Sequence, residues 1–121
     1  MTVKNFKELI VWQKAMDLVV AVYQITQRFP REEIYGLTAQ TRRSAVSVPS
    51  NIAEGQGRRT TRDFINFLSI SDGSLCELKT QLHIAMRLGY VMEQEASPLL
   101  NTADEVHRLL HGLINSLEEK L

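Results

Sequence analysis

SVPSNIAEGQGRRTTRDF, residues 47–64, gathers a proline, two glycines and three arginines into one short stretch. Apolar residues recur at helical spacing before it and again after it. Gly55 is placed to end the first of these helices, and Thr60 followed by Asp63 is a typical start for the second. The stretch therefore predicts a short turn between two helices.

Glycine and proline divide the rest of the chain in the same way, and the segments between them follow helical rather than alternating periodicity. Short connections and one apolar stripe per helix predict an all-α fold, an antiparallel up-and-down four-helix bundle that forms a single domain over residues 1–121. The expected helices are residues 5–28, opened by Asn5 and Glu8; residues 37–54; residues 61–88, closed by Gly89; and a fourth from Ser97 and Pro98, as cap and first helical residue, to near the end of the chain.

Pro49 lies inside the second expected helix, and the apolar positions keep their spacing across it. Proline has no N–H to donate, and its ring crowds the carbonyl four residues back, that of Ala45. We therefore predict that this helix is kinked at Pro49, as a structural feature rather than a functional one.

The first expected helix carries more apolar surface than a small bundle needs. Two apolar stripes together cover more than half of its circumference, whereas about 100° is enough to face a core. The sequence does not decide which stripe faces the core. We expect the excess to form a subunit interface, and the alternative is that Phe29 and the connection around Tyr35 fold over it. The candidate interface residues are Leu9, Trp12, Met16, Val19 and Tyr23; the other stripe is Val11, Ala15, Leu18, Val22, Ile25 and Phe29.

The charge of the chain is unevenly distributed. Its 14 basic and 14 acidic residues give zero net charge over 121 residues. Residues 40–62, however, carry five arginines and one acid, a net charge of +4, and residues 63–121 carry four bases and nine acids, a net charge of −5. This asymmetry predicts an anionic partner for the basic part.

Five arginines are the candidate nucleic-acid-binding residues, because guanidinium groups beside the free N–H groups of a helix start suit phosphate. In the alternative, the arginines pair with acids such as Glu93, Glu95 or Asp104, within a subunit or between subunits. The charge pattern alone does not separate the two. The five are Arg42, Arg43, Arg58, Arg59 and Arg62.

The motifs of common enzymes are missing. EGQG has no preceding strand and no following Gly-Lys-Ser/Thr, so it does not predict a phosphate-binding loop. His107 and His111 have the spacing of a shared metal site, but HRLLH lacks the glutamate of the metalloprotease motif, so we expect a solvated helix surface and no metal. Cys76, the single cysteine, is expected to be a small buried residue. We expect no cofactor and no enzymatic activity.

The same features predict a cytoplasmic protein without a membrane partner. No apolar run approaches the roughly 20 residues needed to cross a bilayer. Residues 1–7 lack the charged-then-apolar order of a signal peptide, and one cysteine agrees with a reducing compartment.

Three segments resemble a known family. FKELIVWQKAMDLVVAVYQIT, FPREEIYGLTAQTRRSAVSVPSNIAEGQGR and DFINFLSISDGSLCELKTQLHIAMRLGY are similar to the bacterial four-helix-bundle family named for proteins encoded in intervening sequences of 23S ribosomal RNA genes. The resemblance implies an antiparallel four-helix bundle and a ring of five subunits. It supplies no catalytic residues, and Arg42, Arg43, Arg58 and Arg59 match basic positions of the family motif.

A related branch comprises accessory proteins of diversity-generating retroelements, which are basic, bind nucleic acid and partner a reverse transcriptase. This chain differs from them in being neutral overall. Two hypotheses result. The first is a non-enzymatic oligomer that binds RNA or DNA through an arginine patch at the turn between the second and third helices. The second is an assembly or adaptor protein of unknown role that binds no nucleic acid and uses the arginines in subunit contacts; a protein partner is compatible with either.

Overall fold

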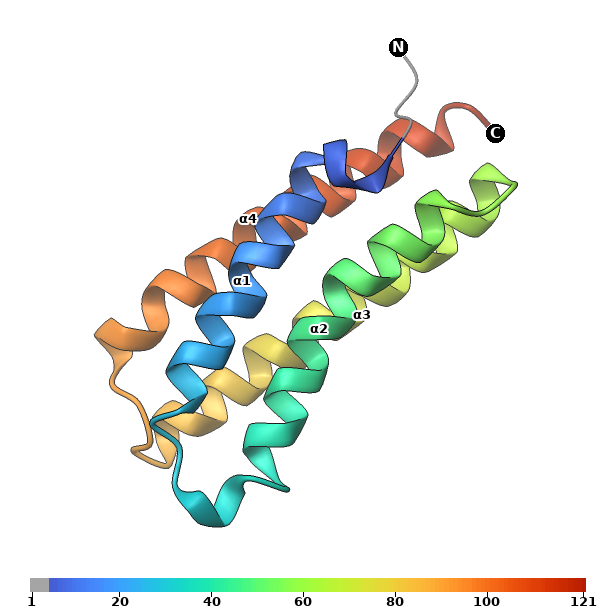
Figure 1. Ribbon diagram of the computed structural model, residues 1–121. Coiled ribbons are helices and arrows are strands. Elements are labelled where there is room, and N and C mark those ends of the chain that lie inside the picture. Colours follow the sequence, from blue (N-terminus) through green and yellow to red (C-terminus); the bar gives the residue numbers. More distant parts are fainter. Residues whose placement is uncertain (1–4) are drawn as a thin grey trace.

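The computed structural model describes residues 5–121, which fold into four long helices without strands. The helices run up and down, so that each is antiparallel to the next (Figure 1). Two short 3-10 segments, η1 and η2, precede α1 and α2. The elements are η1 (Phe6–Glu8), α1 (Ile10–Thr26), η2 (Arg31–Glu33), α2 (Leu37–Gln56), α3 (Thr61–Arg87) and α4 (Glu93–Glu118). The predicted all-α four-helix fold is confirmed.

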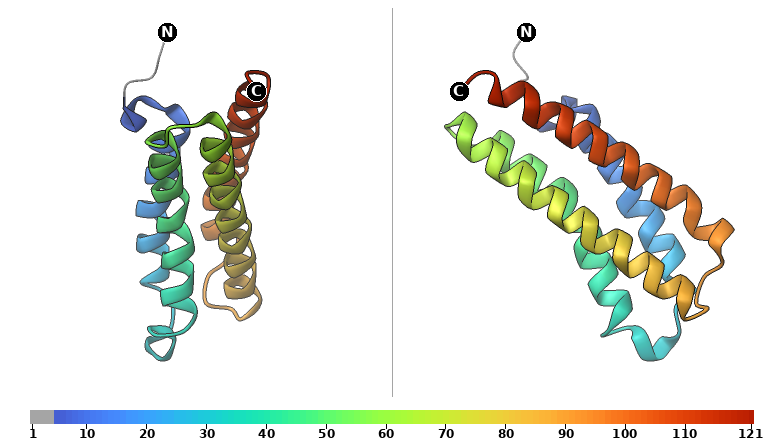
Figure 2. Two further views of the ribbon diagram at one scale, coloured as in Figure 1. Left: turned by 90° about the vertical axis from the view of Figure 1, so that its right-hand side faces the viewer. Right: turned by 180° about the vertical axis from the view of Figure 1, so that it is seen from behind.

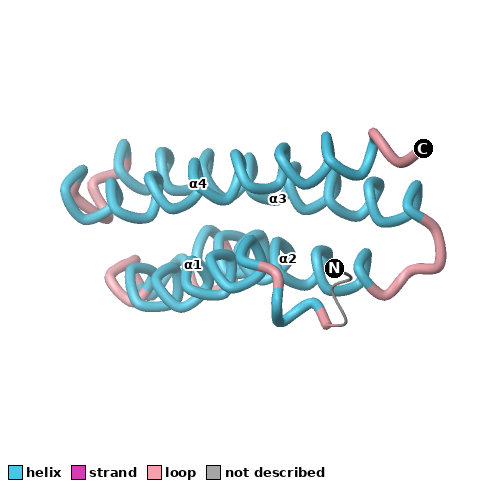
Figure 3. Tube along the Cα trace, turned by 90° about the horizontal axis from the view of Figure 1, so that it is seen from above, coloured by secondary structure: helices cyan, strands magenta, loops and turns pink. Residues whose placement is uncertain are grey.

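The helices form two layers, α1 with α2 and α3 with α4 (Figure 3). Each helix packs against two neighbours, and within residues 5–121 no Cα atoms of the diagonal pairs approach within 8 Å. The α2–α3 turn lies at the same end of the bundle as the end of α4, and the α1–α2 and α3–α4 connections lie at the other end (Figure 2). A site at the α2–α3 turn is therefore a site at one tip of the molecule.

One apolar stripe from each helix fills the space between the layers. On α1 the buried stripe is the one that begins at Val11, and it continues into Phe29 beyond the helix end. The other apolar stripe of α1 lies at the edge of the core: Met16, Val20 and Tyr23 are exposed, and Leu9, Trp12 and Val19 are half-buried. The core residues of α2, α3 and α4 include Ala45, Val48, Ile52, Leu68, Leu75, Leu78, Leu82, Ala85, Leu99, Ala103, Val106 and Leu110.

Small and hydroxyl-bearing residues line the contact between α2 and α3. The Ser71 hydroxyl donates to the Val48 carbonyl oxygen at 2.8 Å, and the Ser47 and Ser74 hydroxyls lie 2.8 Å apart. A Cβ atom on Gly55 would stand 2.6 Å from Phe67 Cβ. The two backbones therefore approach more closely at Gly55 than larger side chains would allow.

This close approach corrects one predicted helix end. Gly55 does not end α2; it is buried inside the helix, which runs to Gln56 and is capped by Gly57 with an ordinary negative φ of −81°. The predicted cap and stop of α3 are confirmed: the Thr60 hydroxyl accepts from the Asp63 amide, and Gly89 has a φ of 77°. Gly55 is thus kept small by packing, and Gly89 by its backbone conformation.

Two helix starts also differ from the prediction. α4 begins at Glu93 rather than at Ser97 and Pro98, because the Glu95 carboxylate accepts from the Met92 amide at 2.9 Å and caps the helix one turn earlier. Asn5 caps the 3-10 segment η1, and α1 proper begins at Ile10.

α2 continues as a helix through Pro49 without interruption. The kink predicted at Pro49 stays a prediction. None of the helices formed by residues 5–121 combines the length and hydropathy needed to cross a membrane. The prediction that residues 1–7 are not a signal peptide concerns a segment that lies mostly outside the described residues.

We predict that Gly55→Ala destabilises the bundle. The added methyl group would collide with Phe67 Cβ, and overpacking of about 1–3 kcal/mol outweighs the gain in helix propensity of about 0.5–1 kcal/mol. Gly73→Ala on α3 is the matched control, because a Cβ there meets no atom within 4 Å, and it should stabilise the protein by about 0.5–1 kcal/mol. Urea unfolding of the wild type and the two variants measures both changes in the free energy of unfolding. Equal effects of Gly55→Ala and Gly73→Ala would contradict the close packing inferred at Gly55.

Candidate functional site

The five predicted arginines do not form one patch. Fourteen residues at 1.5 Å per residue separate Arg42 from Gln56, the last residue of α2, by about 21 Å, and Arg58 lies beyond this helix end. Arg42 and Arg43 lie in the first half of α2, whereas Arg58, Arg59 and Arg62 lie at the α2–α3 turn at the tip of the bundle. The structure therefore places two separate groups of arginines where the sequence suggested a single surface.

At the α2–α3 turn the arginines differ in their surroundings. Arg58 forms an ion pair with Glu54 one turn earlier, and its guanidinium carbon lies 4.7 Å from the centre of the Phe67 ring. Arg59 and Arg62 are exposed and have no ion-pair partner within residues 5–121. Arg59 precedes the N-cap of α3 and Arg62 lies in its first turn, whose early amides lack intrahelical acceptors. The turn thus presents two unpaired guanidinium groups beside a helix N-terminus.

Arg42 has a different role. Its Nε donates to the Thr26 hydroxyl at 2.8 Å, and its guanidinium carbon lies 4.6 Å from the centre of the Tyr23 ring. Both partners belong to α1, so this half-buried side chain fastens α2 to α1. Arg43 is exposed and lies beside it, at a hollow that Tyr23 and Val46 also line.

The acids proposed as partners for the arginines are partly engaged elsewhere. Glu95 pairs with Arg28 at 2.6 Å, and Asp104 pairs with Lys79 at 2.7 Å. No ion pair between the five arginines and these acids occurs in the described part of the chain. Pairing between subunits stays a prediction.

The uncovered stripe of α1 continues onto α2 as one apolar surface. Met16, Val20 and Tyr23 are 39%, 56% and 41% exposed. A groove of about 360 Å³ joins the stripe to α2, and its lining includes Trp12, Met16, Val19, Val46, Pro49 and Ala53. We call this surface, formed by the uncovered stripe and these α2 residues, the α1–α2 apolar face.

The connection between α1 and α2 does not cover this face. Tyr35 is 94% exposed, and Phe29 is buried in the core beside the Tyr90 ring. The alternative in which Phe29 and the Tyr35 connection cover the excess apolar surface is therefore wrong. Of the predicted interface residues, Met16 and Tyr23 are exposed, whereas Leu9, Trp12 and Val19 are half-buried against the core. Their role in an interface stays a prediction.

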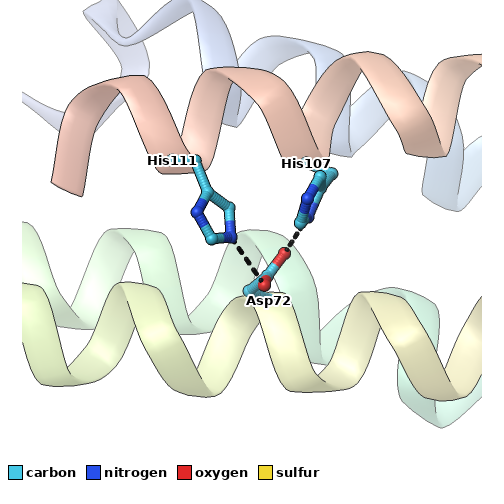
Figure 4. Close-up of side chains that lie close together, drawn as sticks. All are labelled: Asp72, His107 and His111. Carbon is cyan, nitrogen blue, oxygen red and sulfur yellow. Dashed lines mark hydrogen bonds and ion pairs between the residues drawn. The ribbon is translucent and has the colours of Figure 1, made fainter. Parts of the chain in front are cut away.

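A cluster of two histidines and one aspartate connects α3 to α4, the two helices of the second layer. His107 and His111 project from α4 toward Asp72 on α3 (Figure 4). His107 Nδ1 lies 2.7 Å from Asp72 Oδ1, and His111 Nε2 lies 3.0 Å from Asp72 Oδ2. Partial burial raises the pKa of the Asp72 carboxyl, but the hydrogen bonds and charge of the two imidazoles outweigh it, so that this pKa lies below its ordinary value of 3.8.

Comparison with known proteins decides the family. Residues 7–112 match the model of the family described as 23S rRNA-intervening sequence protein. The chain belongs to this family.

A solved structure has the same fold. It is a protein of unknown function from the S23 ribosomal protein family of Bacteroides thetaiotaomicron, 24% identical, with a TM-score of 0.78 over 87% of this chain and 98% of that one. No curated protein matches the chain. Neither the family description nor the structural relative names an enzymatic activity. The link of this family member to retroelement accessory proteins stays a prediction.

Sequence reasoning missed the partners that come from distant segments. Asp72 lies 35 residues before His107, and nothing in the local pattern joins them. The signal that could have found this pairing is the helix face of Asp72, because an acid on α3 meets the histidines only if it faces α4. Cys76 is exposed, so its predicted burial is wrong, because it projects from α3 outside the core stripe.

We predict that Arg42→Ala destabilises this family member by about 1–2 kcal/mol, the sum of a hydrogen bond and a cation–π contact. Arg59→Ala, which removes an exposed side chain without an ion-pair partner in the described chain, should change the free energy of unfolding by less than about 0.5 kcal/mol. Chemical denaturation of both variants measures the difference. If Arg42→Ala proved neutral, the division of the arginines into two roles would be wrong.

Proposed function

We propose that this member of the 23S rRNA-intervening sequence protein family is a cytoplasmic, non-enzymatic protein that binds nucleic acid as a homo-oligomer. The observation that carries the proposal is the pair of exposed arginines at the α2–α3 turn, Arg59 and Arg62. Unpaired guanidinium groups next to a helix N-terminus supply both charge and N–H donors to phosphate. Because the family description names 23S rRNA, structured RNA is the first nucleic acid to test.

Self-assembly supplies the affinity that one turn lacks. Two or three phosphate contacts per subunit bind weakly, but copies held in one assembly act together on a single strand or duplex. The α1–α2 apolar face supports assembly, because an exposed apolar surface that spans two helices is typical of an interaction site. A ring of five is the arrangement that the family resemblance implies.

The second candidate is an assembly or adaptor protein that binds no nucleic acid. The location of Arg42 and Arg43 favours it for these two residues, because both lie at the apolar surface between α1 and α2 rather than at the tip. In that case the tip arginines contact acids of a neighbouring subunit or of a protein partner.

Charge reversal separates the two candidates. We expect Arg59→Glu with Arg62→Glu to abolish binding of a structured RNA in fluorescence anisotropy and to leave the oligomer intact. With duplex DNA, the log–log salt slope of the wild type should exceed that of the neutralised Arg59→Ala with Arg62→Ala variant by about 2 per engaged subunit, from about 0.9 for each contact.

Arg87→Glu with Arg108→Glu is the matched control, because it changes the net charge equally at two exposed arginines outside the α2–α3 turn, one at the end of α3 and one within α4. It should retain most of the affinity. Loss of the oligomer in the Arg59/Arg62 variant would support subunit contacts instead, and absence of RNA and DNA binding at low salt would reject the proposal.

We also predict that Met16→Glu with Val20→Glu converts the oligomer to a folded monomer. Both side chains are exposed in the single chain, so the charges cost little there but would be buried in an interface. Ile84→Glu, at an isoleucine on α3 that is 42% exposed, should leave the oligomer unchanged. Light scattering after size exclusion measures the mass of each. A monomeric wild type would remove the basis for this interface.

A further inference from the structure

Asp72, His107 and His111 bring three metal-ligand side chains together on two helices. The relevant ligand atoms, one carboxylate oxygen and one nitrogen from each ring, all lie within 4.8 Å of one another. The histidines are one turn apart on α4, and their ring centres are 4.3 Å apart. Asp72 comes from α3, so any ion held here would join two helices of one layer.

The cluster is held in place by the packing of α3 on α4. The Asp72 side chain is only 19% exposed, and each of its oxygens faces a different imidazole. The histidines are about half-exposed, which leaves their rings free to adjust and one side open to water. Farther along the same α3–α4 contact, Lys79 of α3 forms an ion pair with Asp104 of α4. The carboxylate is thus fixed, and the two imidazoles adapt to it.

We propose that Asp72, His107 and His111 bind one divalent transition-metal ion of the zinc type, with water as the fourth ligand. Two imidazole nitrogens and one carboxylate oxygen are a typical three-residue zinc set. Ligand atoms around a tetrahedral zinc ion with bonds of about 2.0–2.1 Å lie roughly 3.3 Å apart. The 2.7 and 3.0 Å contacts run to different oxygens of Asp72, and one carboxylate oxygen with one nitrogen from each ring falls within 4.8 Å. Rotation of the half-exposed rings is therefore needed to bring the three ligand atoms to the zinc spacing.

The donor set also determines which ions compete. A single carboxylate with two imidazoles suits zinc, nickel and copper, whereas magnesium and calcium prefer oxygen ligands. The site cross-links α3 and α4 on the layer opposite the α1–α2 apolar face. It is therefore independent of the proposed nucleic-acid and subunit surfaces, and its test does not depend on theirs.

The test is zinc titration of the untagged, chelator-treated protein by isothermal calorimetry. We expect one zinc ion per chain and a melting temperature that rises with zinc concentration, because the ion binds only the folded arrangement of α3 and α4. A hundredfold excess of magnesium should not displace it. Binding that magnesium abolishes, or no zinc binding in the micromolar range, would overturn the proposal.

Substitution of the proposed ligands tests where the ion binds. Asp72→Asn and His111→Ala should each weaken zinc binding by about tenfold or more, since removal of a direct ligand costs at least as much as removal of its supporting contacts. His83→Ala is the matched control, because it removes the remaining histidine of the chain, an exposed residue of α3 outside the cluster. Circular dichroism of the metal-free variants establishes that each is folded. Equal zinc affinity in His111→Ala and His83→Ala would overturn the assignment.

Discussion

The close approach of α2 and α3 is the constraint on which the other features depend. Gly55 lets the Phe64 and Phe67 side chains of α3 lie against the α2 backbone, and Ser47, Ser71 and Ser74 satisfy polar groups along the same contact. Because the two helices meet so closely next to their connection, the turn between them is short and its arginines are held at the tip of the bundle. The position of the candidate nucleic-acid site thus follows from the absence of a side chain at Gly55.

The same packing explains why one face of α1 is left uncovered. In a two-layer bundle with no diagonal contacts, the long-helix neighbours of α1 in residues 5–121 are α2 and α4, and these cover the stripe that begins at Val11. η1 covers only the start of the other stripe, where the Phe6 ring lies 5.2 Å from the Trp12 ring. Met16, Val20 and Tyr23 stay exposed, and the Tyr35 ring in the α1–α2 connection points into solvent. A fifth element or a second chain is needed to bury that surface, and no fifth long helix occurs in residues 5–121.

The sequence predicts what depends on neighbours along the chain and fails where distant segments meet. Helical periodicity predicts all four helices, and local chemistry predicts the Thr60 cap and the Gly89 stop. It misplaces the start of α4, because the Glu95 cap competes with the Ser97 and Pro98 signal. It assigns Gly55 to a helix end, because a glycine required by a close approach is indistinguishable locally from one required by a turn. The site partners Thr26 and Asp72 are set by helix packing alone.

The different surroundings of the arginines decide which of them suit an interface. Arg42 is already satisfied within the chain by a hydroxyl and an aromatic ring, so another subunit can cover it with little further loss of hydration. Arg59 and Arg62 have no such partners in the described structure, and burying them against an apolar surface would leave two charges uncompensated. An uncompensated guanidinium group requires water or an anion. Assembly through the α1–α2 apolar face keeps the tip in water, so the two surfaces can be used at the same time.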